Sequence, residues 1–179
     1  MSETRYPTDQ GDGTPPSDPA ESLIAGLASK NGAERLRARE RLLEIGEPAV
    51  PALIMALKSP DENVRWEAAK ALGEICDPRA ATALVDALED TQSAVRWLAA
   101  KALIALGRSG LVAVLRGVER CVDNVWMKDG VIHVLHTLVR EGIAPEASTV
   151  LEALEDIQPR IEAPVAAYHV LQSLQKQPG

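Results

Sequence analysis

The sequence contains no phenylalanine and few other aromatic residues, with three Trp and two Tyr making up 3% of 179 residues. Folds rich in β-strands depend on aromatic and β-branched side chains to fill their cores. In this chain 46% of the residues are apolar, so the core must be built from Ala, Leu, Val and Ile. The composition therefore argues against a β-rich fold and favours helices that pack closely through small side chains.

Long apolar runs and cysteine patterns are also missing. No run of about 18 apolar residues occurs, so the sequence predicts no membrane-spanning helix, and the first residues lack the features of a signal peptide. The two cysteines, Cys76 and Cys121, form no CxxC pair. In a cytoplasmic protein, which these absences predict, we expect both to be reduced and buried thiols.

Positive charge is in short supply, since 19 Lys and Arg face 26 Asp and Glu, for a net charge of −7. Nucleic-acid binders need basic surface to displace counterions, so this balance argues against a nucleic-acid partner. Residues 1–17 are acidic, rich in Pro, Gly, Ser and Thr, and show no apolar periodicity. We predict a disordered acidic N-terminal tail over residues 1–17, followed by a single domain over residues 18–176.

The dominant feature of the domain is an internal repeat of about 30 residues. Residues 64–72, VRWEAAKAL, recur as residues 95–103, VRWLAAKAL, with eight identities in nine positions. Each unit holds two amphipathic helices, A and B, whose apolar residues recur at helical spacing. Pro48 and Pro78 lie in the turns between A and B, where proline can open a helix but cannot lie inside one.

Neither helix of a unit can bury its apolar stripe alone, so the units must stack on one another. The units are well defined to about residue 120, whereas residues 122–176 carry a looser pattern that is typical of a degenerate C-terminal cap. The predicted fold is all-α: an α-α superhelix, or α-solenoid, of about five stacked helix pairs.

Residues 61–88, DENVRWEAAKALGEICDPRAATALVDAL, closely resemble the HEAT-like repeat first associated with phycobilisome lyases. In that family the pattern runs D-x-x-V-R-x-x-A-A-x-A-L-G-x-I-x-D-P-R-A-x-x-x-L-x-x-A-L, and the resemblance covers about residues 20–120 well. It implies the α-solenoid fold. It does not specify a function, since the class includes chromophore lyase subunits, scaffolds and adaptors.

The resemblance also implies a role for two arginines. Arg65 and Arg96 begin successive A helices, beside Asp61 and shortly after Asp90. We expect bidentate arginine–aspartate links that join neighbouring units. The alternative, recognition of an anion, is less favoured because acidic residues lie close to both arginines.

The outer side of the B helices, here named the helix-B face, is the first candidate site. In HEAT arrays the B helices usually line the concave face, and here their outward side chains are mostly small, with charges that change sign along the array. Such a surface suits a protein segment or helix, and it supplies no general base, nucleophile or phosphate-binding loop. The residues expected to contact a partner are Met55, Thr82, Asp86, Glu89, Ala113, Gly117 and Arg120.

The three tryptophans mark a second candidate surface. Trp66, Trp97 and Trp126 occupy one position in successive A helices, on the side opposite the A–B seam, and Leu36 takes that position in the first A helix. The rings could form an apolar ladder that grips a partner, as Trp often does at interface hot spots. Alternatively, each ring lies across the groove between adjacent units, which the rarity of large exposed apolar patches on monomers favours.

Asp129, His133 and His136 form a D-x-x-x-H-x-x-H pattern on the fourth A helix. Two His at i and i+3 can share a face and bind metal, but a zinc site needs a third or fourth ligand in place. The HExxH signature is absent. We therefore favour a solvated helix face and predict no metal and no cofactor.

These patterns favour a monomeric, non-catalytic adaptor that binds a protein partner along the helix-B face. The alternative is an enzyme subunit of the phycobilin lyase type, or a chaperone for a chromophore protein, for which only residues 129–140 offer suitable polar groups. A HEAT-like DNA glycosylase is the least favoured, because Asp86 and Glu89 lie where such an enzyme needs positive charge.

Overall fold

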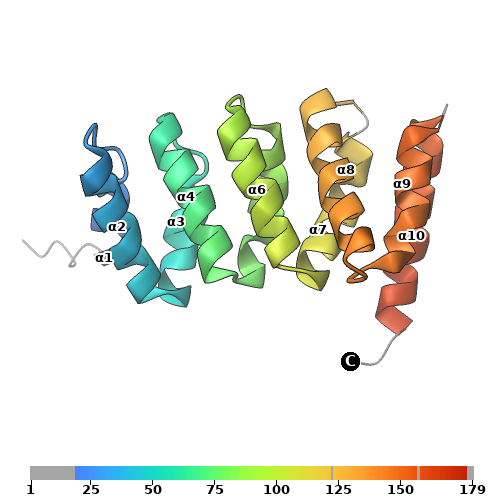
Figure 1. Cartoon of the computed structure of the whole chain (residues 1–179), viewed down its shortest axis with the longest axis horizontal. Coiled ribbons are helices and arrows are strands. Elements are labelled where there is room, and N and C mark those ends of the chain that lie inside the picture. Colours follow the sequence, from blue (N-terminus) through green and yellow to red (C-terminus); the bar gives the residue numbers. More distant parts are fainter. Residues whose placement is uncertain (1–18, 122, 157, 177–179) are drawn as a thin grey trace, which may run out of the picture.

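The computed structural model describes residues 19–121, 123–156 and 158–176, so the predicted tail lies outside the described residues. Over these ranges the chain forms α-helices and short 3-10 helices and no strand. The ten α-helices of the described residues stand side by side in successive pairs (Figure 1). The predicted all-α superhelix is therefore confirmed.

The helix bounds follow the predicted repeat. The helices are α1 (Pro19–Gly26), α2 (Gly32–Ile45), α3 (Val50–Ala56), α4 (Glu62–Ile75), α5 (Ala81–Asp86), α6 (Ser93–Ala105), α7 (Arg108–Cys121), α8 (Val125–Arg140), α9 (Ser148–Glu155) and α10 (Pro159–Lys176). Three of them, α3, α5 and α9, follow 3-10 helices that contain Pro48, Pro78 and Pro145 in their first turn. Proline opens these helices because its fixed φ suits a first helical turn and its missing N–H needs no partner there.

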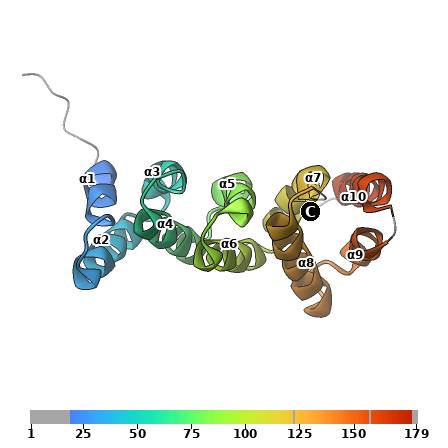
Figure 2. The ribbon, with the colours of Figure 1, turned by 90° about the horizontal axis from the view of Figure 1, so that it is seen from above.

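The pairs form two rows, which Figure 2 shows from above. The B helices α1, α3, α5 and α7 lie in one row, and the A helices α2, α4, α6 and α8 lie in the other. The last pair reverses this order, because α9 packs beside α8 while α10 packs beside α7. The row of B helices shows no pronounced inward curve in Figure 2, since a small rotation per unit accumulates little over five units.

The core between the rows is made of leucine and alanine. Leu42, Leu72 and Leu103 are fully buried at equivalent positions of three A helices, and small residues fill the contacts between them. At Gly73 an added Cβ would lie 3.1 Å from the Cβ of Ala102, so α4 and α6 approach as closely as their side chains permit. This close approach explains why the core needs no phenylalanine.

Two sets of polar contacts join neighbouring A helices. Glu67 of α4 forms a buried ion pair with Arg39 of α2 and a second ion pair with the half-buried Arg35. Further along, Arg65 of α4 binds Asp90 through two hydrogen bonds, Nε to Oδ2 at 2.6 Å and Nη2 to Oδ1 at 3.1 Å. The implied bidentate link is therefore present at Arg65.

The second implied link is not formed. Arg96 donates from Nη1 to the backbone carbonyls of Asp90 at 2.8 Å and Thr91 at 3.2 Å. None of the described carboxylates forms an ion pair with Arg96. Asp90 lies 25 residues after Arg65. The position 25 residues after Arg96 is occupied by Cys121, which supplies no carboxylate.

Candidate functional site

The structure places the predicted helix-B residues along one row, on α3, α5, the 3-10 helix after α5, and α7. The side chain of Met55 is 67% exposed. Thr82, Asp86 and Arg120 are exposed as well, whereas Glu89 and Ala113 are half-buried. Most of this set therefore lies on an accessible surface.

Gly117 is the exception, because it is buried between helices. An added Cβ would lie 2.9 Å from Cγ1 of Val85 and 3.3 Å from Cε of Met127. The helical spacing that predicted an outward position did not account for the close approach of α7 to α5 within the row. Gly117 permits this approach and does not face a partner.

The charges on the helix-B face pair with one another. Arg120 of α7 donates to Asp86 of α5 at 2.8 Å, with both side chains about half exposed. Asn124 donates to Glu89 at 3.3 Å. The predicted alternation of charge thus becomes a set of cross-links between neighbouring units, which leaves little net charge on this part of the face.

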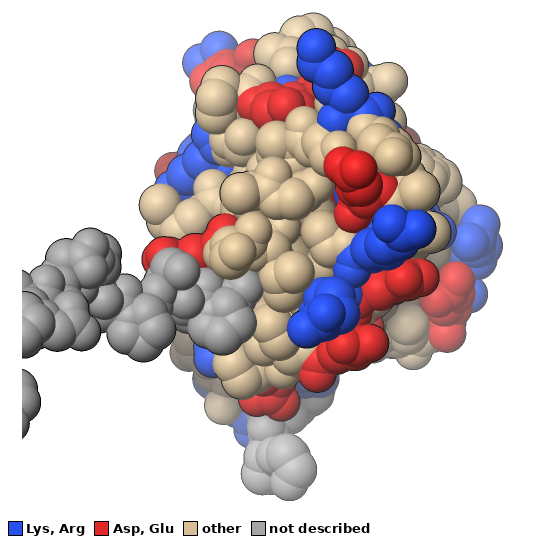
Figure 3. All heavy atoms as spheres, turned by 90° about the vertical axis from the view of Figure 1, so that its left-hand side faces the viewer, with Lys and Arg blue, Asp and Glu red and all other residues tan. Residues whose placement is uncertain are grey.

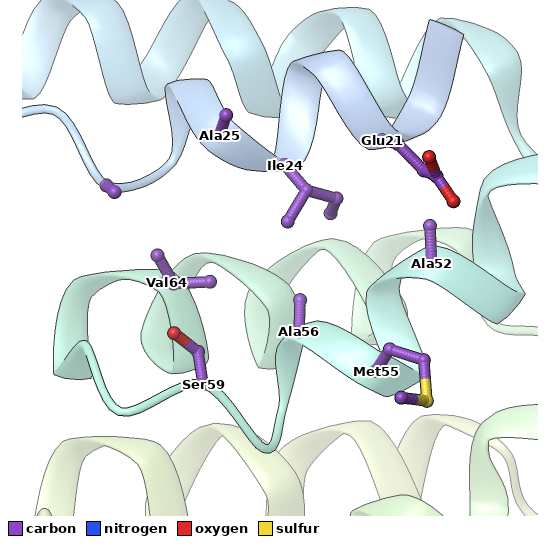
Figure 4. Close-up of a pocket in the computed structure, with 9 residues that line it drawn as sticks. Glu21, Ile24, Ala25, Ala52, Met55, Ala56, Ser59 and Val64 are labelled. Atoms are coloured by element: carbon purple, nitrogen blue, oxygen red, sulfur yellow. The ribbon is translucent and has the colours of Figure 1, made fainter. Parts of the chain in front are cut away.

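The first B helices enclose an apolar hollow of about 420 Å³ between α1 and α3. Figure 4 shows Ile24 projecting from α1 toward Ala56 of α3, with Met55 at one edge and the carboxylate of Glu21 at the rim. The lining is otherwise mostly alanine, which underfills the space between the two helices. Its apolar lining and the exposed Met55 make this hollow a candidate binding feature of the helix-B face.

This hollow was not predicted from the sequence. Ile24 of α1 is half-buried and faces it. The small residues Ala52 and Ala56 face α1 and leave space beside Ile24. The corresponding residues one unit later are also alanines, Ala83 and Ala87, so the small pair alone does not distinguish this position. Such a space becomes visible only when the facing helix is known.

The end of the array that α1 and α2 form is seen in Figure 3. Uncharged side chains occupy its middle, and charged side chains of both signs border it. Arg41 and Glu44, for example, pair at 3.4 Å on α2. A surface with such mixed charge provides no continuous basic patch for a polyanion on this end of the molecule.

The second predicted surface lies on the other row. Trp97 and Trp126 are 55% and 48% exposed, Leu36 is exposed, and Trp66 is half-buried against the core. The ring of Trp97 stacks on that of His133, with centroids 5.1 Å apart, and the guanidinium of Arg96 lies 4.8 Å from the centroid of Trp126. These two rings lie across the groove between α6 and α8, but about half of each remains open to solvent.

A second hollow lies between α6 and α8, with a volume of about 250 Å³. Its walls come from both helices, and the lining residues are Ser93, Arg96, Trp97, Ala100, Trp126, Asp129, Gly130 and His133. It joins aromatic rings to a guanidinium, which is a suitable setting for a ligand that is both apolar and anionic.

The candidate metal ligands are not brought together. His133 is half-buried against Trp97, whereas Asp129 and His136 are exposed. Within the described ranges, no group of three or more His, Cys, Asp or Glu is arranged to hold a metal ion.

The two cysteines have different environments. Cys121 is fully buried, and this burial raises the pKa of its thiol from about 9.0 to about 11. Cys76 is exposed, contrary to the prediction, because it ends α4 in the left-handed conformation, with φ of 57°, and so leaves the buried stripe. Its thiol donates to the carbonyl of Ala105 at 3.4 Å.

Comparison with known proteins supports the repeat class. Residues 20–104 match the family model for HEAT repeats. No curated protein matches the chain. Among solved structures, the chain is similar to one in the complex of CpcE and CpcF of phycocyanin lyase from Nostoc sp. PCC7120, with 25% sequence identity, a TM-score of 0.49, and coverage of 99% of this chain and 71% of that chain. None of the helices in the described part of the chain has the length and apolar character needed to cross a membrane.

Proposed function

We propose that this chain, whose residues 20–104 are HEAT repeats, is a scaffold that holds a segment of a partner protein against its helix-B face. The observation that carries this proposal is the apolar hollow between α1 and α3, with Met55 exposed at its edge. A helical array offers such a surface without a conformational change, because each unit packs against its neighbours.

The chemistry of the face defines the partner. A single large apolar side chain, such as Leu or Ile, fits a hollow of about 420 Å³ and gains about 1.5–3 kcal/mol on complete burial. The cross-linked charges at Asp86 and Arg120 then lie along the same row for polar contacts at the edge of the interface. We therefore expect an amphipathic helix or extended segment that presents one anchoring apolar residue.

The alternative role, as an enzyme subunit of the phycobilin lyase type, would need polar groups that face a bilin. Lyase activity belongs to the phycocyanin lyase of the similar solved structure and is not carried over to this chain by the likeness. In this chain the half-buried ring of His133 stacks on Trp97, and no observation favours it as a group that acts on a bilin.

The test compares binding by the full chain and by two variants of the hollow. Met55→Asp places a charge at its edge, and Ala25→Trp fills it from an exposed position of α1. Proteins captured from extracts of the source cells are identified, and the affinity of each is measured by calorimetry. Loss of an anchoring contact of about 2 kcal/mol weakens binding about thirty-fold.

The control is Val125→Asp, which places the same charge at a site that is 71% exposed, at the start of α8 in the other row. We expect this variant to bind as the parent does. If both hollow variants bind every captured protein with the parent's affinity, the helix-B face is not the binding surface.

A further inference from the structure

The hollow between α6 and α8 contains an arginine whose counterpart in the preceding unit is bound by a carboxylate. Nη1 of Arg65 donates to backbone carbonyls six and five residues upstream, those of Ser59 at 3.0 Å and Pro60 at 3.2 Å. Nη1 of Arg96 donates to the carbonyls at the same offsets, those of Asp90 and Thr91. The two guanidinium groups are therefore anchored in the same way.

The remaining donors of the two arginines differ in their surroundings. Nε and Nη2 of Arg65 bind Asp90, and this hydrogen bonding, together with the charges of Asp90, Glu62 and Asp61, raises the pKa of Arg65. At Arg96, no hydrogen bond from Nε or Nη2 to a carboxylate occurs within the described residues.

The repeat explains this difference, because the acidic residues around Arg65 are replaced around Arg96. The positions 31 residues after Asp61 and Glu62 are occupied by the uncharged residues Gln92 and Ser93. The side chain of Asp61 caps α4 by accepting from a backbone N–H, whereas that of Gln92 caps nothing at the start of α6. Compared with the start of α4, the start of α6 therefore carries less negative charge, whereas the arginine is present in both.

The walls of the hollow hold the guanidinium in place and supply apolar contact area. The face of Trp126 lies against Arg96, which restricts the plane of the guanidinium and leaves its edge available to a planar acceptor. Trp97 and His133 form the adjoining wall. Each Trp is about half exposed, so a ligand can cover the rings without rearrangement.

Asp129 also lines the hollow, and its charge limits which anions can bind. For a phosphate dianion, the repulsion by Asp129 and the attraction to Arg96 both double relative to a carboxylate, so the second negative charge brings no selective gain here. The net charge of −7 likewise disfavours a polyanion. A monoanion joined to apolar groups fits better, since the carboxylate can reach Arg96 while the apolar part covers the rings.

We propose that Arg96, Trp97 and Trp126 form a recognition site for an acidic peptide, in which one Glu or Asp side chain binds Arg96 and a neighbouring large apolar side chain covers the tryptophans. The site lies in the row of A helices, so it is separate from the helix-B face and does not depend on the function proposed for that face.

The three tryptophans allow a direct test by NMR on the full chain, because each gives one indole N–H signal and Trp66 serves as an internal control. The probe is the peptide acetyl-Gly-Glu-Leu-Gly-amide, compared with its Gln counterpart. We expect the signals of Trp97 and Trp126 to shift saturably with the Glu peptide while that of Trp66 stays in place. We expect the Gln peptide to bind up to about five-fold more weakly, since an exposed charge pair contributes up to about 1 kcal/mol.

Three variants complete the test, each first shown to be folded by circular dichroism. Arg96→Gln should abolish the preference for the Glu peptide, and Arg116→Gln, which changes an exposed arginine of α7, should leave it unchanged. Asp129→Asn leaves Arg96 intact and should tighten binding about two-fold by removing a like charge. Equal shifts with the two peptides, or equal shifts of all three indole signals, would overturn the proposal. An unchanged preference in Arg96→Gln or no tightening in Asp129→Asn would also overturn it.

Discussion

Glu67 carries the charge that balances two arginines inside the interface between α2 and α4. Its side chain is 5% exposed, and that of its partner Arg39 is 9% exposed. Nε of Arg39 is buried without a hydrogen-bond partner among the described residues, so the ion pair with Glu67 is its main compensation. Arg35 adds a second cation, with Nε 3.4 Å from Oε1 of Glu67. Removing Glu67 would therefore leave a buried positive charge unpaired.

The perturbation is Glu67→Leu, which copies the next unit, where Leu98 lies 31 residues later. Breaking a buried ion pair from one side costs about 3–5 kcal/mol of unfolding free energy. For a chain of this size, each kcal/mol lowers the melting temperature by about 2–4 °C, so we expect a decrease of about 6–20 °C. The double variant Arg39→Ala and Glu67→Leu removes the two most buried charges and copies the pairing of Ala69 with Leu98 in the next interface. Arg35 keeps its charge, but its side chain is 22% exposed and donates to the carbonyl of Ser29. The double variant should regain most of the loss, because a well-packed apolar pair can replace a buried ion pair without cost.

Thermal melts followed by circular dichroism measure the effect on the whole array. The fluorescence of Trp66, in a background where Trp97 and Trp126 are replaced by Phe, reports on unfolding near α4. The two probes separate local from global loss, since neighbouring units of a repeat protein can unfold separately. A single variant that melts within about 3 °C of the parent would refute the reasoning. A double variant less stable than the single variant would refute it equally, because it would show that the charges are not the source of the cost.

Three further predictions concern single positions. Gly110→Ala should destabilise the chain by about 3 kcal/mol or more, because its Cβ would lie 2.0 Å from the carbonyl oxygen of Leu103. Gly142→Ala meets nothing within 4 Å and should cost about 1 kcal/mol, because the φ of residue 142 is 71°. Urea unfolding of both variants measures these free energies. Cys76 should react with a thiol reagent in the native protein at pH 8, whereas Cys121 should react only after unfolding, because burial raises its pKa to about 11. Since the unfolded thiol ionises near pH 9, stability should decrease by about 2 kcal/mol between pH 9 and 11, and Cys121→Ala should remove that part of the decrease.

The sequence was sufficient for the architecture because the features that define it are local. Helical spacing of apolar residues, prolines at the starts of the B helices and the near-identical segments 64–72 and 95–103 all act within one unit. Stacking then follows, since no unit can bury its stripe alone. The reversed order of α9 and α10 was not foreseen, because it depends on which neighbour accepts each helix and not on the pattern within it.

The details of the candidate sites were predicted less well, because they depend on contacts between units. Gly117 has the helical position of a surface residue, but the approach of Val85 from α5 buries it. The exposure of Cys76 depends on a left-handed turn that ends α4. The hollow beside Met55 exists because two facing helices both carry small residues, which neither helix shows alone.

The two units that share the segment Val-Arg-Trp differ in what their arginines bind, although both arginines anchor Nη1 to the preceding turn in the same way. In one unit Asp90 binds the other donors of Arg65, and the arginine joins neighbouring repeats. In the next unit the corresponding donors of Arg96 lie beside two half-exposed tryptophans with no described carboxylate bound to them. Because the fold already shows that this arginine geometry binds a carboxylate from a neighbouring unit, a carboxylate from another protein is the simplest group to complete it.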